Sequence, residues 1–197
     1  MTRASSSADR RDRILDAALQ CFLESGIPST TVEDIRARSG SSVGSIYHHF
    51  GSKEELAAAL YLGLLRKYQQ GSLSVLRGSR GAEETIKALV RYHLRWVEKH
   101  TDWSRYLFEM RTAEAVRSAE KEIGMLNRDF AVALKAWAQQ YIDDGKIRSA
   151  PVDVIVALVF GPAQSFARFW LAGATGTSIQ RAAQMIGQSA WDGLRAR

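Results

Sequence analysis

The sequence predicts an all-α protein, and three observations favour that fold class. With 46% hydrophobic residues among 197, the chain can bury a substantial core. It contains only 3 prolines and no run of alternating β-branched residues of the kind that forms strands. Apolar residues recur instead at helical spacing along most of the chain. We therefore predict an N-terminal three-helix head with a helix-turn-helix (residues 9–55), joined by a fourth helix to a helical-bundle body (residues 56–197).

The first predicted elements are a short leader and an amphipathic helix. Residues 1–8 are small and polar, so we interpret them as a disordered leader. In residues 9–25, Ile14 and Phe22 belong to an apolar stripe that recurs every four residues, which predicts a helix with one apolar side. Gly26 ends this helix, since glycine is a common stop signal at a helix C-terminus.

Two short helices follow, each marked by a capping signal. Thr30 or Thr31 caps the second helix, because each is followed three positions later by an acidic residue. Ser41 or Ser42 caps the third helix, which runs to Phe50. With the Ser-Gly-Ser-Ser turn between them, these helices have the layout of a helix-turn-helix, whose second helix enters the major groove of DNA.

The body is predicted to consist of longer helices. Ser52 and Glu55 have the spacing of a capping box and open a fourth helix, which carries an apolar stripe from Leu56 to Tyr68. Breaks at Gly, Pro, Asp or Thr separate the later elements. The predicted helices span residues 53–76, 82–100, 102–115, 116–144, 152–172 and 178–195.

The chain carries a net charge of +6, but the excess does not lie in the head. Residues 1–55 hold seven Lys and Arg side chains against eight Asp and Glu, which gives this segment a formal charge of −1. Proteins that bind DNA without sequence preference usually have a strongly basic contact surface. The charge pattern therefore favours sequence-selective recognition over an architectural, sequence-tolerant DNA-binding role, which remains the alternative.

Several classes of protein are disfavoured by what the sequence lacks. The start has no apolar core of a signal peptide, and no uninterrupted run of 18 apolar residues is present, so we expect a cytoplasmic protein with no membrane partner. Cys21 is the single cysteine and cannot form an intramolecular disulfide. His48 and His49 are adjacent on one helix and do not face a common site, so we expect no metal and no other cofactor. No nucleophile motif or phosphate-binding loop is present; a helical enzyme is the least favoured alternative, and no catalytic residue is assigned.

The third helix is predicted to divide its side chains between a core and an exposed face. Ile46 and Phe50 lie one turn apart and form the predicted core pair. Val43 and Tyr47, also one turn apart, form an edge that faces either the core or the groove. The outer face near the helix N-terminus, where side chains reach bases and phosphates, consists of Ser42, Gly44, Ser45 and His48.

Four residues of this region carry specific expectations. Gly44 costs about 1 kcal/mol of helix stability, and two interpretations stay open: close approach of the backbone to DNA, or a merely tolerated glycine. Tyr47 is expected to donate its hydroxyl to a phosphate, the alternative being an ordinary tyrosine at the edge of the core. His48 is expected to contact a phosphate or a base. Lys53 opens the fourth helix, whose N-terminal dipole also attracts phosphate.

Three consecutive motifs, TTVEDI, SGSSVGSIYHHF and GSKEEL, closely resemble the N-terminal domain of the TetR (tetracycline-repressor-like) family of transcriptional regulators. The resemblance covers residues 11–60; beyond them only the helical character of the body is similar. It implies that Thr31 caps the second helix near a phosphate, and that His49 and Lys53 lie near the DNA backbone. The DNA-binding residues assigned from the motif and the resemblance together are Thr31, Ser42, Val43, Gly44, Ser45, Tyr47, His48, His49 and Lys53.

The sequence departs from the pattern of that family at three positions. Arg36 and Ser39 stand where the family usually has alanine, and Arg36 is expected either to extend into solvent or to reach a phosphate. Val43 occupies a site that is often polar in relatives, and on DNA it would contact a thymine methyl group rather than form a hydrogen bond. The bases that this helix reads therefore cannot be transferred from the family.

Aromatic and methionine side chains recur at helical spacing in the body. Such stripes usually form plain core, but together they can also wall an apolar cavity. The family resemblance implies a small effector bound inside the body, which moves the fourth helix and changes the spacing of two heads. The candidate effector-pocket residues are Tyr92, His93, Trp96, Tyr106, Met110, Phe130, Trp137, Phe166 and Trp170, and the candidate polar groups are His93, Arg95 and Gln164.

The last two predicted helices are rich in small residues, which allow helices to approach closely. These residues are Ala157, Gly161, Ala163, Ala167, Ala182, Ala183, Gly187 and Ala190. The resemblance implies a four-helix bundle with a second subunit, the alternative being an intramolecular bundle, and Pro162 predicts a kink. We expect a homodimer that reads two half-sites of a palindromic double-stranded operator, about one helical turn apart. We expect it to act as a repressor that a small, largely apolar effector releases.

Overall fold

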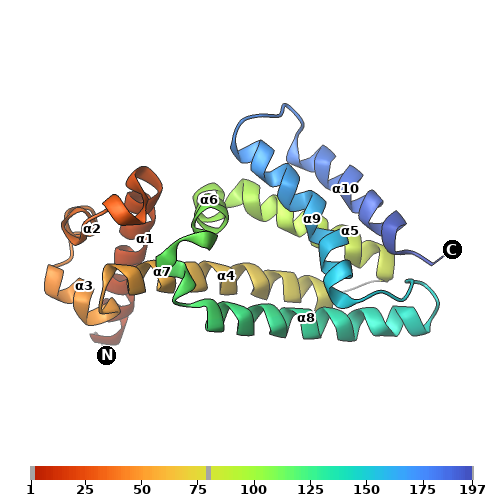
Figure 1. The fold of residues 1–197 in the computed structure, drawn as a ribbon, viewed down its shortest axis with the longest axis horizontal. Coiled ribbons are helices and arrows are strands. Elements are labelled where there is room, and N and C mark those ends of the chain that lie inside the picture. Colours follow the sequence, from red (N-terminus) through yellow and green to blue (C-terminus); the bar gives the residue numbers. More distant parts are fainter. Residues whose placement is uncertain (1–2, 79–80, 197) are drawn as a thin grey trace. The chain divides into compact units, whose positions relative to one another are not determined.

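The computed structural model describes residues 3–78 and 81–196 (Figure 1). In this part of the chain the backbone forms ten α-helices and one short 3₁₀ helix, which confirms the predicted all-α class. In chain order the elements are α1 (Arg3–Ser29), α2 (Val32–Ser39), α3 (Val43–Phe50), α4 (Lys53–Arg77), α5 (Ala82–Lys99), α6 (Thr101–Glu109), η1 (Met110–Thr112), α7 (Glu114–Arg117), α8 (Glu120–Asp143), α9 (Val152–Leu171) and α10 (Ile179–Leu194).

Helix α1 begins earlier than the sequence predicts. Its backbone is helical from Arg3, so the segment interpreted as a disordered leader is helical from residue 3 onward, while residues 1 and 2 lie outside the described residues. Extending an existing helix avoids the unfavourable nucleation step, and alanine and arginine are good helix formers. At the other end, Gly26 has φ 74° and ψ 160° and interrupts the helix, which confirms the predicted stop.

The chain folds into two compact units. Unit 1 comprises Met1–Leu65 and Asp102–Ile123, and unit 2 comprises Arg66–Thr101 and Gly124–Arg197. The boundaries fall inside α4 and α8, so each of these helices contributes residues to both units. This division differs from the predicted boundary after residue 55, because a segment from the middle of the chain belongs to the N-terminal unit.

Tyr106 on α6 explains why that middle segment belongs to unit 1. Its side chain is fully buried, and its hydroxyl donates to the carbonyl of Ala57 at 2.9 Å. Its ring centroid lies 6.2 Å from that of Phe22 and 6.5 Å from that of Tyr61. These contacts join α1, α4 and α6 in one apolar core, to which α2 and α3 also contribute.

The structure corrects the predicted helices between residues 102 and 144. Helix α6 ends at Glu109, a 3₁₀ turn follows, α7 is a single turn, and α8 begins only at Glu120. The break lies at Ala113, whose backbone is extended with φ −62° and ψ 140°. Val116 is fully buried in the core of unit 1. Packing this apolar segment into the core overrides the helix propensity that predicted two unbroken helices.

In unit 2, helices α5, α9 and α10 pack against one another (Figure 1). Beyond α10 the chain pairs with the segment that follows α8: the Arg148 amide donates to the Leu194 carbonyl at 2.9 Å, and the Ala196 amide donates to the Lys146 carbonyl at 3.0 Å. These two bonds hold the C-terminal end of α10 in place.

Helix α9 is long and apolar enough to cross a membrane by length and composition alone, with a mean hydropathy of 1.5 in one 18-residue window. The prediction of no membrane span considered only uninterrupted apolar runs, and in this helix Gln164, Ser165 and Arg168 interrupt the apolar residues. One side of α9, including Val159, is buried in unit 2. The opposite side leaves Phe169 58% exposed, so α9 presents an apolar surface that the described chain does not cover.

Candidate functional site

The start of α2 is fixed by a reciprocal cap. The Thr31 hydroxyl accepts from the Asp34 amide at 3.1 Å, and the Thr31 amide donates to the Asp34 carboxylate at 2.8 Å. The predicted choice between two threonines is thereby resolved, because the Thr30 side chain is buried and donates to the Gly26 carbonyl at 2.8 Å. The Thr31 hydroxyl also donates to the Asp34 carboxylate at 2.7 Å, and this bond, together with that from the Thr31 amide, lowers the pKa of the Asp34 carboxyl below its usual range. The cap sets the direction in which α2 leaves α1.

A tight turn and a second cap position α3. Gly40 adopts φ 65° in the left-handed region, and its amide donates to the Arg36 carbonyl at 3.0 Å. The Ser42 hydroxyl then accepts from the Ser45 amide at 3.1 Å, so Ser42 rather than Ser41 is the N-cap of α3. A left-handed residue at the end of one helix and a serine cap at the start of the next are what a helix-turn-helix requires.

Helix α3 separates a buried side from an exposed one, as predicted. Ile46 and Phe50 are 1% and 6% exposed and pack into the core of unit 1. On the other side, Tyr47 is 48% exposed and His48 is exposed. A large aromatic side chain held in water on a short, well-capped helix is a common feature of a recognition surface.

The remaining residues assigned to DNA contact surround that exposed side. Ser42 and Gly44 are exposed, while Val43, Ser45 and His49 are half-buried. A Cβ atom added at Gly44 would meet no other atom within 4 Å. The glycine is therefore not required by packing within the chain, which leaves a role toward an outside partner open.

Lys53 has a structural role that the sequence did not indicate. Its ammonium group donates to the carbonyls of Thr30 and Pro28, at 2.8 and 3.1 Å. These bonds tie the first turn of α4 to the junction between α1 and α2. Because an ammonium group has three N–H donors, one donor remains after these two bonds.

Arginine side chains connect the head internally. Arg38 on α2 makes two hydrogen bonds of 2.7 Å to the Glu24 carboxylate on α1, and this pairing lowers the pKa of Glu24. Arg36, the departure from the family pattern, pairs with Glu33 on its own helix. The guanidinium carbon of Arg11 lies 5.1 Å from the centre of the Phe50 ring, which places a cation of α1 beside the end of α3.

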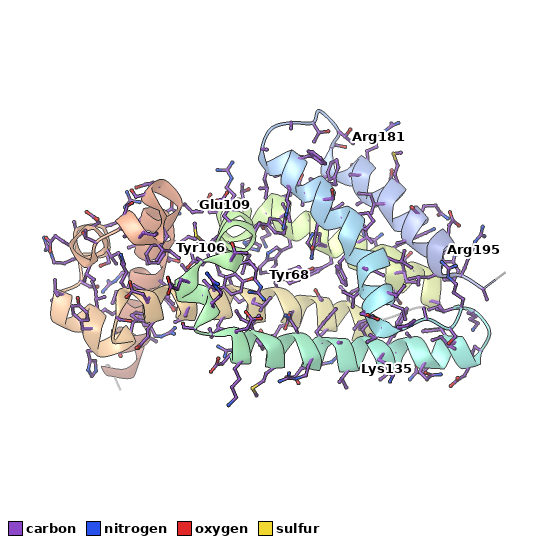
Figure 2. All side chains as sticks on the ribbon, in the orientation of Figure 1. Tyr68, Tyr106, Glu109, Lys135, Arg181 and Arg195 are labelled. Atoms are coloured by element: carbon purple, nitrogen blue, oxygen red, sulfur yellow. The ribbon has the colours of Figure 1, made fainter. Side chains whose placement is uncertain are left out.

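In unit 2 a second group of predicted residues forms a connected aromatic cluster. Tyr92, His93 and Trp96 on α5 contact Tyr68 on α4, with ring centroids 5.6 to 5.8 Å apart. His93 also contacts the ring of Phe160 at 6.1 Å. We call this group, with Phe130 and His100 at its edges, the ring cluster. Figure 2 labels Tyr68 within it.

The polar groups of the ring cluster are held in neutral form. The Tyr68 hydroxyl and His93 Nδ1 are 2.8 Å apart, and the Tyr92 hydroxyl donates to the Tyr68 carbonyl at 3.0 Å. Burial lowers the pKa of His93 to about 4 and raises the pKa of Tyr68 above its usual range. At neutral pH the ring cluster is therefore uncharged and apolar, with a few fixed hydrogen-bonding groups.

The structure divides the nine residues predicted for an effector pocket. Tyr92, His93, Trp96 and Phe130 belong to the ring cluster. Tyr106 and Met110 instead pack in the core of unit 1. The others lie elsewhere in unit 2: Trp137 contacts Tyr141, and Phe166 and Trp170 are half-buried on α9. Of the predicted polar groups, Arg95 and Gln164 are exposed and lie outside the ring cluster.

Sequence reasoning missed Tyr68, Phe160, His100 and Gly71, which shape the ring cluster. Tyr68 and Phe160 are central to it, and Gly71 allows it to form, because a Cβ atom at Gly71 would lie 2.0 Å from the Tyr92 hydroxyl. The signal for Tyr68 was present in the apolar stripe of the fourth helix. Nothing in the sequence pairs Gly71 with a tyrosine that follows it by twenty-one positions.

A third feature of unit 2 is the exposed side of α9 and α10. Val154, Phe169 and Met185 are 42%, 58% and 61% exposed. Between the first two, the exposed positions of α9 include the small residues Ala157 and Gly161. Apolar and small side chains exposed together are typical of a helix surface that packs against another protein.

Metal chemistry finds no support in the described part of the chain. Within residues 3–78 and 81–196, no three His, Cys, Asp or Glu side chains come together in a way that could hold a metal ion. Cys21 is a buried free cysteine, and its burial raises the pKa of the thiol, which makes the thiol less reactive.

Comparisons with known proteins agree with this geometry. Residues 14–60, which contain both caps and all of α3, match the bacterial regulatory proteins of the tetR family. The transcriptional repressor KstR2 of Rhodococcus jostii is 29% identical over 157 residues, which cover 79% of this chain and 75% of that protein.

Solved structures share the fold over nearly the whole chain. A TetR family transcription regulator from Marinobacter aquaeolei covers 100% of both chains with a TM-score of 0.82 and 19% identity. The transcriptional regulator FadR from Bacillus subtilis, solved in complex with stearoyl-CoA, covers 92% of this chain and 97% of its own, with a TM-score of 0.75 and 17% identity. At these identities the likeness establishes the fold of both units.

Proposed function

The chain belongs to the TetR family of bacterial regulatory proteins, and from this premise we propose that it is a sequence-specific, ligand-responsive repressor of transcription. The observation that carries the proposal is the split of α3, which buries Ile46 and Phe50 and leaves Tyr47 and His48 in solvent. In this proposal α3 enters the major groove, and the capped start of α2 faces the phosphates.

Each residue of the interface has a distinct task in the proposal. Val43, Ser45 and His48 face base edges, where valine favours a thymine methyl group. Tyr47 donates its hydroxyl to a phosphate. Lys53 holds α4 against the junction of α1 and α2 with two N–H groups, and directs the third to the DNA backbone. The interface is completed by the N-caps Thr31 and Ser42 and by the close approach of Gly44 and His49.

The effector is proposed to bind at the ring cluster of unit 2. An uncharged aromatic site with a buried imidazole and phenol suits a small, largely apolar molecule. Tyr68 lies on α4, the helix that also contributes residues to unit 1, so a ligand that displaces Tyr68 acts directly on this helix. The KstR2 and FadR regulators, one of them solved with stearoyl-CoA, support a ligand-responsive repressor.

The protein is proposed to act as a homodimer in the cytoplasm, without catalytic activity. The apolar side of α9 and α10, which includes Phe169 and Met185, is the proposed contact with the second subunit. Two copies related by a two-fold axis would present two recognition helices to a palindromic operator. Replacing Phe169 with Glu is expected to convert the dimer to a monomer in light scattering after size exclusion. Lys135→Glu, at an exposed position of α8, is the control.

The central experiment selects duplexes from a random library with the intact protein and measures affinity for the selected duplex by fluorescence anisotropy. Tyr47→Ala is expected to weaken binding by about 10- to 100-fold, the equivalent of roughly 1–3 kcal/mol. Tyr47→Phe removes only the hydroxyl and is expected to lose less. Circular dichroism must show both variants folded.

Two outcomes would contradict the proposal. An affinity that Tyr47→Ala leaves unchanged would show that α3 is not the recognition helix. Uniform coverage of DNA, with no enriched sequence and no defined footprint, would favour the architectural alternative. Release of the selected duplex by stearoyl-CoA, the ligand of FadR, is the first test of the effector class.

A further inference from the structure

A groove between α5 and α10, away from the ring cluster, has the composition of an anion-binding site. It has a volume of about 610 Å³. Its lining residues all belong to unit 2: Lys87, Arg91, Arg95 and Glu98 from α5, and Ser178, Ile179, Gln180, Ala183, Gln184 and Gln188 from α10 and its N-cap. The α5 wall carries three cations and one carboxylate, and three of the six residues of the opposite wall are glutamines.

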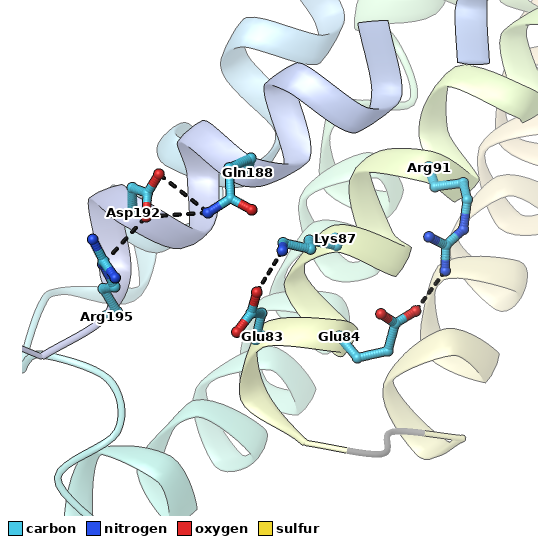
Figure 3. Close-up of polar contacts among 7 residues, drawn as sticks. All are labelled: Glu83, Glu84, Lys87, Arg91, Gln188, Asp192 and Arg195. Carbon is cyan, nitrogen blue, oxygen red and sulfur yellow. Dashed lines mark hydrogen bonds and ion pairs between the residues drawn. The ribbon is translucent and has the colours of Figure 1, made fainter. Parts of the chain in front are cut away.

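The two helices that form the groove run antiparallel. A Cβ atom added at Gly187 of α10 would lie 3.4 Å from the Cα atom of Lys87, so the backbones approach closely there. Farther along α10, Trp191 and Arg195 line a second hollow together with the first residues of α5. Figure 3 shows this end, with Gln188 of α10 beside Lys87 of α5. Toward the other end of α5, the groove continues to the N-cap of α10.

Both walls repeat their polar side chains once per helical turn. On α5 the cations follow one another at intervals of four residues, from Lys87 to Arg91 to Arg95. On α10 the amides of Gln180, Gln184 and Gln188 have the same interval. Since a helix rises about 1.5 Å per residue, each row spans roughly 12 Å, with about 6 Å between neighbouring groups. An extended row of cations opposite a row of amide donors suits an elongated ligand with several acceptor oxygens.

Weak ion pairs restrain two of the three cations. Lys87 pairs with Glu83, and Arg91 pairs with Glu84 at 2.7 Å (Figure 3). The carboxylates of both pairs are more than half exposed, and exposed pairs contribute little because water and salt screen them. In the described residues, Arg95 forms no ion pair. A phosphate group that enters the groove therefore competes with two weak carboxylate contacts, and Glu98 is the one carboxylate in the lining itself.

We propose that this groove binds a small anion that carries at least two phosphate groups. The cations supply charge-assisted hydrogen bonds, and the two guanidinium groups can bind phosphate oxygens in pairs. The glutamine row supplies further N–H donors. The groove faces away from the ring cluster on α5, since Tyr92, His93 and Trp96 lie on the opposite side of that helix. The proposal does not depend on the function proposed above.

The probe for this site is inorganic tripolyphosphate, titrated into the full chain by calorimetry at constant ionic strength. The double variant Arg91→Gln/Arg95→Gln is expected to weaken binding by about tenfold, because two charge-assisted contacts are lost. A matched control, Lys135→Gln/Arg181→Gln, removes the same charge from exposed positions of unit 2 outside the groove (Figure 2). The control is expected to change affinity less than about twofold.

A variant that binds tripolyphosphate more tightly would show that the cations of the groove bind anions and do not only stabilise the fold. Glu83→Gln/Glu84→Gln removes the competing carboxylates without touching the lining of the groove. It is expected to tighten tripolyphosphate binding by about two- to threefold. The head contributes equally to anion binding in all of these variants, so differences among them report the groove.

Three results would overturn the proposal. One is equal affinity of the parent protein and the Arg91/Arg95 double variant. Another is an equal loss in the Lys135/Arg181 control, which would reveal only a general charge effect. The third is an orthophosphate affinity as high as that of tripolyphosphate, which would exclude an elongated ligand with several phosphates.

Discussion

The head and the body of this protein satisfy their polar groups in opposite ways. In the head, each cap joins residues three positions apart: Thr31 with Asp34, Ser42 with Ser45, and Ser52 with Glu55. In unit 2, the hydroxyl of Tyr68 meets a ring 25 positions away, and Gln69 donates to Asn127 across 58 positions. The caps of the head therefore follow local rules, although Lys53 and Arg38 add bonds to Pro28, Thr30 and Glu24 over 14 to 25 positions. The hydrogen bonds of the ring cluster in the body depend entirely on partners that only the complete fold brings together.

This difference also bears on function. Local caps satisfy the backbone at the ends of α2 and α3 and leave exposed the side of α3 that we propose contacts DNA. Long-range bonds in the body place polar groups inside an apolar cluster, and the effector proposed to bind there would exchange these bonds for its own. Local caps suit a rigid DNA-binding head, and long-range hydrogen bonds suit a body that rearranges when an effector binds.

The largest expected difference between the two regions is in acid, where we expect the body to lose more stability than the head. The folded-state pKa of His93 is about 4, below the usual value of 6.5, so the stability due to neutral His93 is complete above pH 6.5 and is lost as pH falls toward 4. The free energy of unfolding of unit 2 is expected to fall by about 3 kcal/mol over that range. Chemical denaturation followed by tryptophan fluorescence measures it, since Trp96, Trp137, Trp170 and Trp191 lie in unit 2.

A control for this prediction is His93→Phe, which removes the titrating group and should flatten the pH dependence whatever its effect on stability. The head provides the contrast. The folded-state pKa of Asp34 is depressed, so its contribution is present above its usual value of 3.8 and is lost only as pH falls below that value. Loss of the head before the body on acidification would contradict the comparison.

Gly71→Ala tests a long-range contact of the body by adding one Cβ atom beside Tyr92. The new Cβ would lie 2.0 Å from the Tyr92 hydroxyl and 2.4 Å from the adjacent ring carbon, so the ring must move and lose its bond to Tyr68. We expect a loss of about 2 kcal/mol, typical of overpacking, in denaturant titrations. Gly63→Ala is the matched control on the same helix: its Cβ meets nothing within 4 Å, and the change should stabilise by up to about 1 kcal/mol. Equal changes in the free energy of unfolding at both positions would contradict the inference that the packing of Tyr92 requires a glycine at position 71.

The predictability of the fold follows the same division. The caps, the Gly26 stop and the buried pair of Ile46 and Phe50 were predicted because each depends on residues within one or two helical turns. The break at Ala113 was not, because it results from burying Val116 in a core assembled from distant segments. Local propensity carries no information about such a core.

The candidate site shows the same limit. The motif predicted which candidate residues lie on the exposed side of α3. Lys53 was expected only at a phosphate, because its bonds to Thr30 and Pro28 depend on how the chain folds back on itself. In the body, the aromatic stripes predicted four of the seven rings of the ring cluster. They could not show that Tyr106 belongs to a different core, where it bonds to Ala57.

Lys53→Met tests one of the long-range polar contacts of the head, that of Lys53 with Thr30 and Pro28. Removing its two bonds to carbonyls should cost about 1 kcal/mol, reduced from the value for a buried ammonium because the side chain is half-buried. A chain of this size should then melt about 2–4 °C lower in scanning calorimetry. If the third N–H group also contacts a phosphate, the slope of operator affinity against salt should fall by about 1. An unchanged melting temperature would mean that local caps alone hold the head.

Gly44→Ala has the smallest effect on stability and decides between the two interpretations of this glycine. The methyl group enters open space within the chain, so helix propensity should raise the free energy of unfolding by up to about 1 kcal/mol. If α3 approaches DNA closely at this position, operator affinity falls at the same time, and stability and binding change in opposite directions. The Gly63→Ala variant, which also fills open space, should stabilise without any loss of affinity. A Gly44→Ala protein that is more stable and binds its operator as tightly as the parent would show that this glycine is merely tolerated.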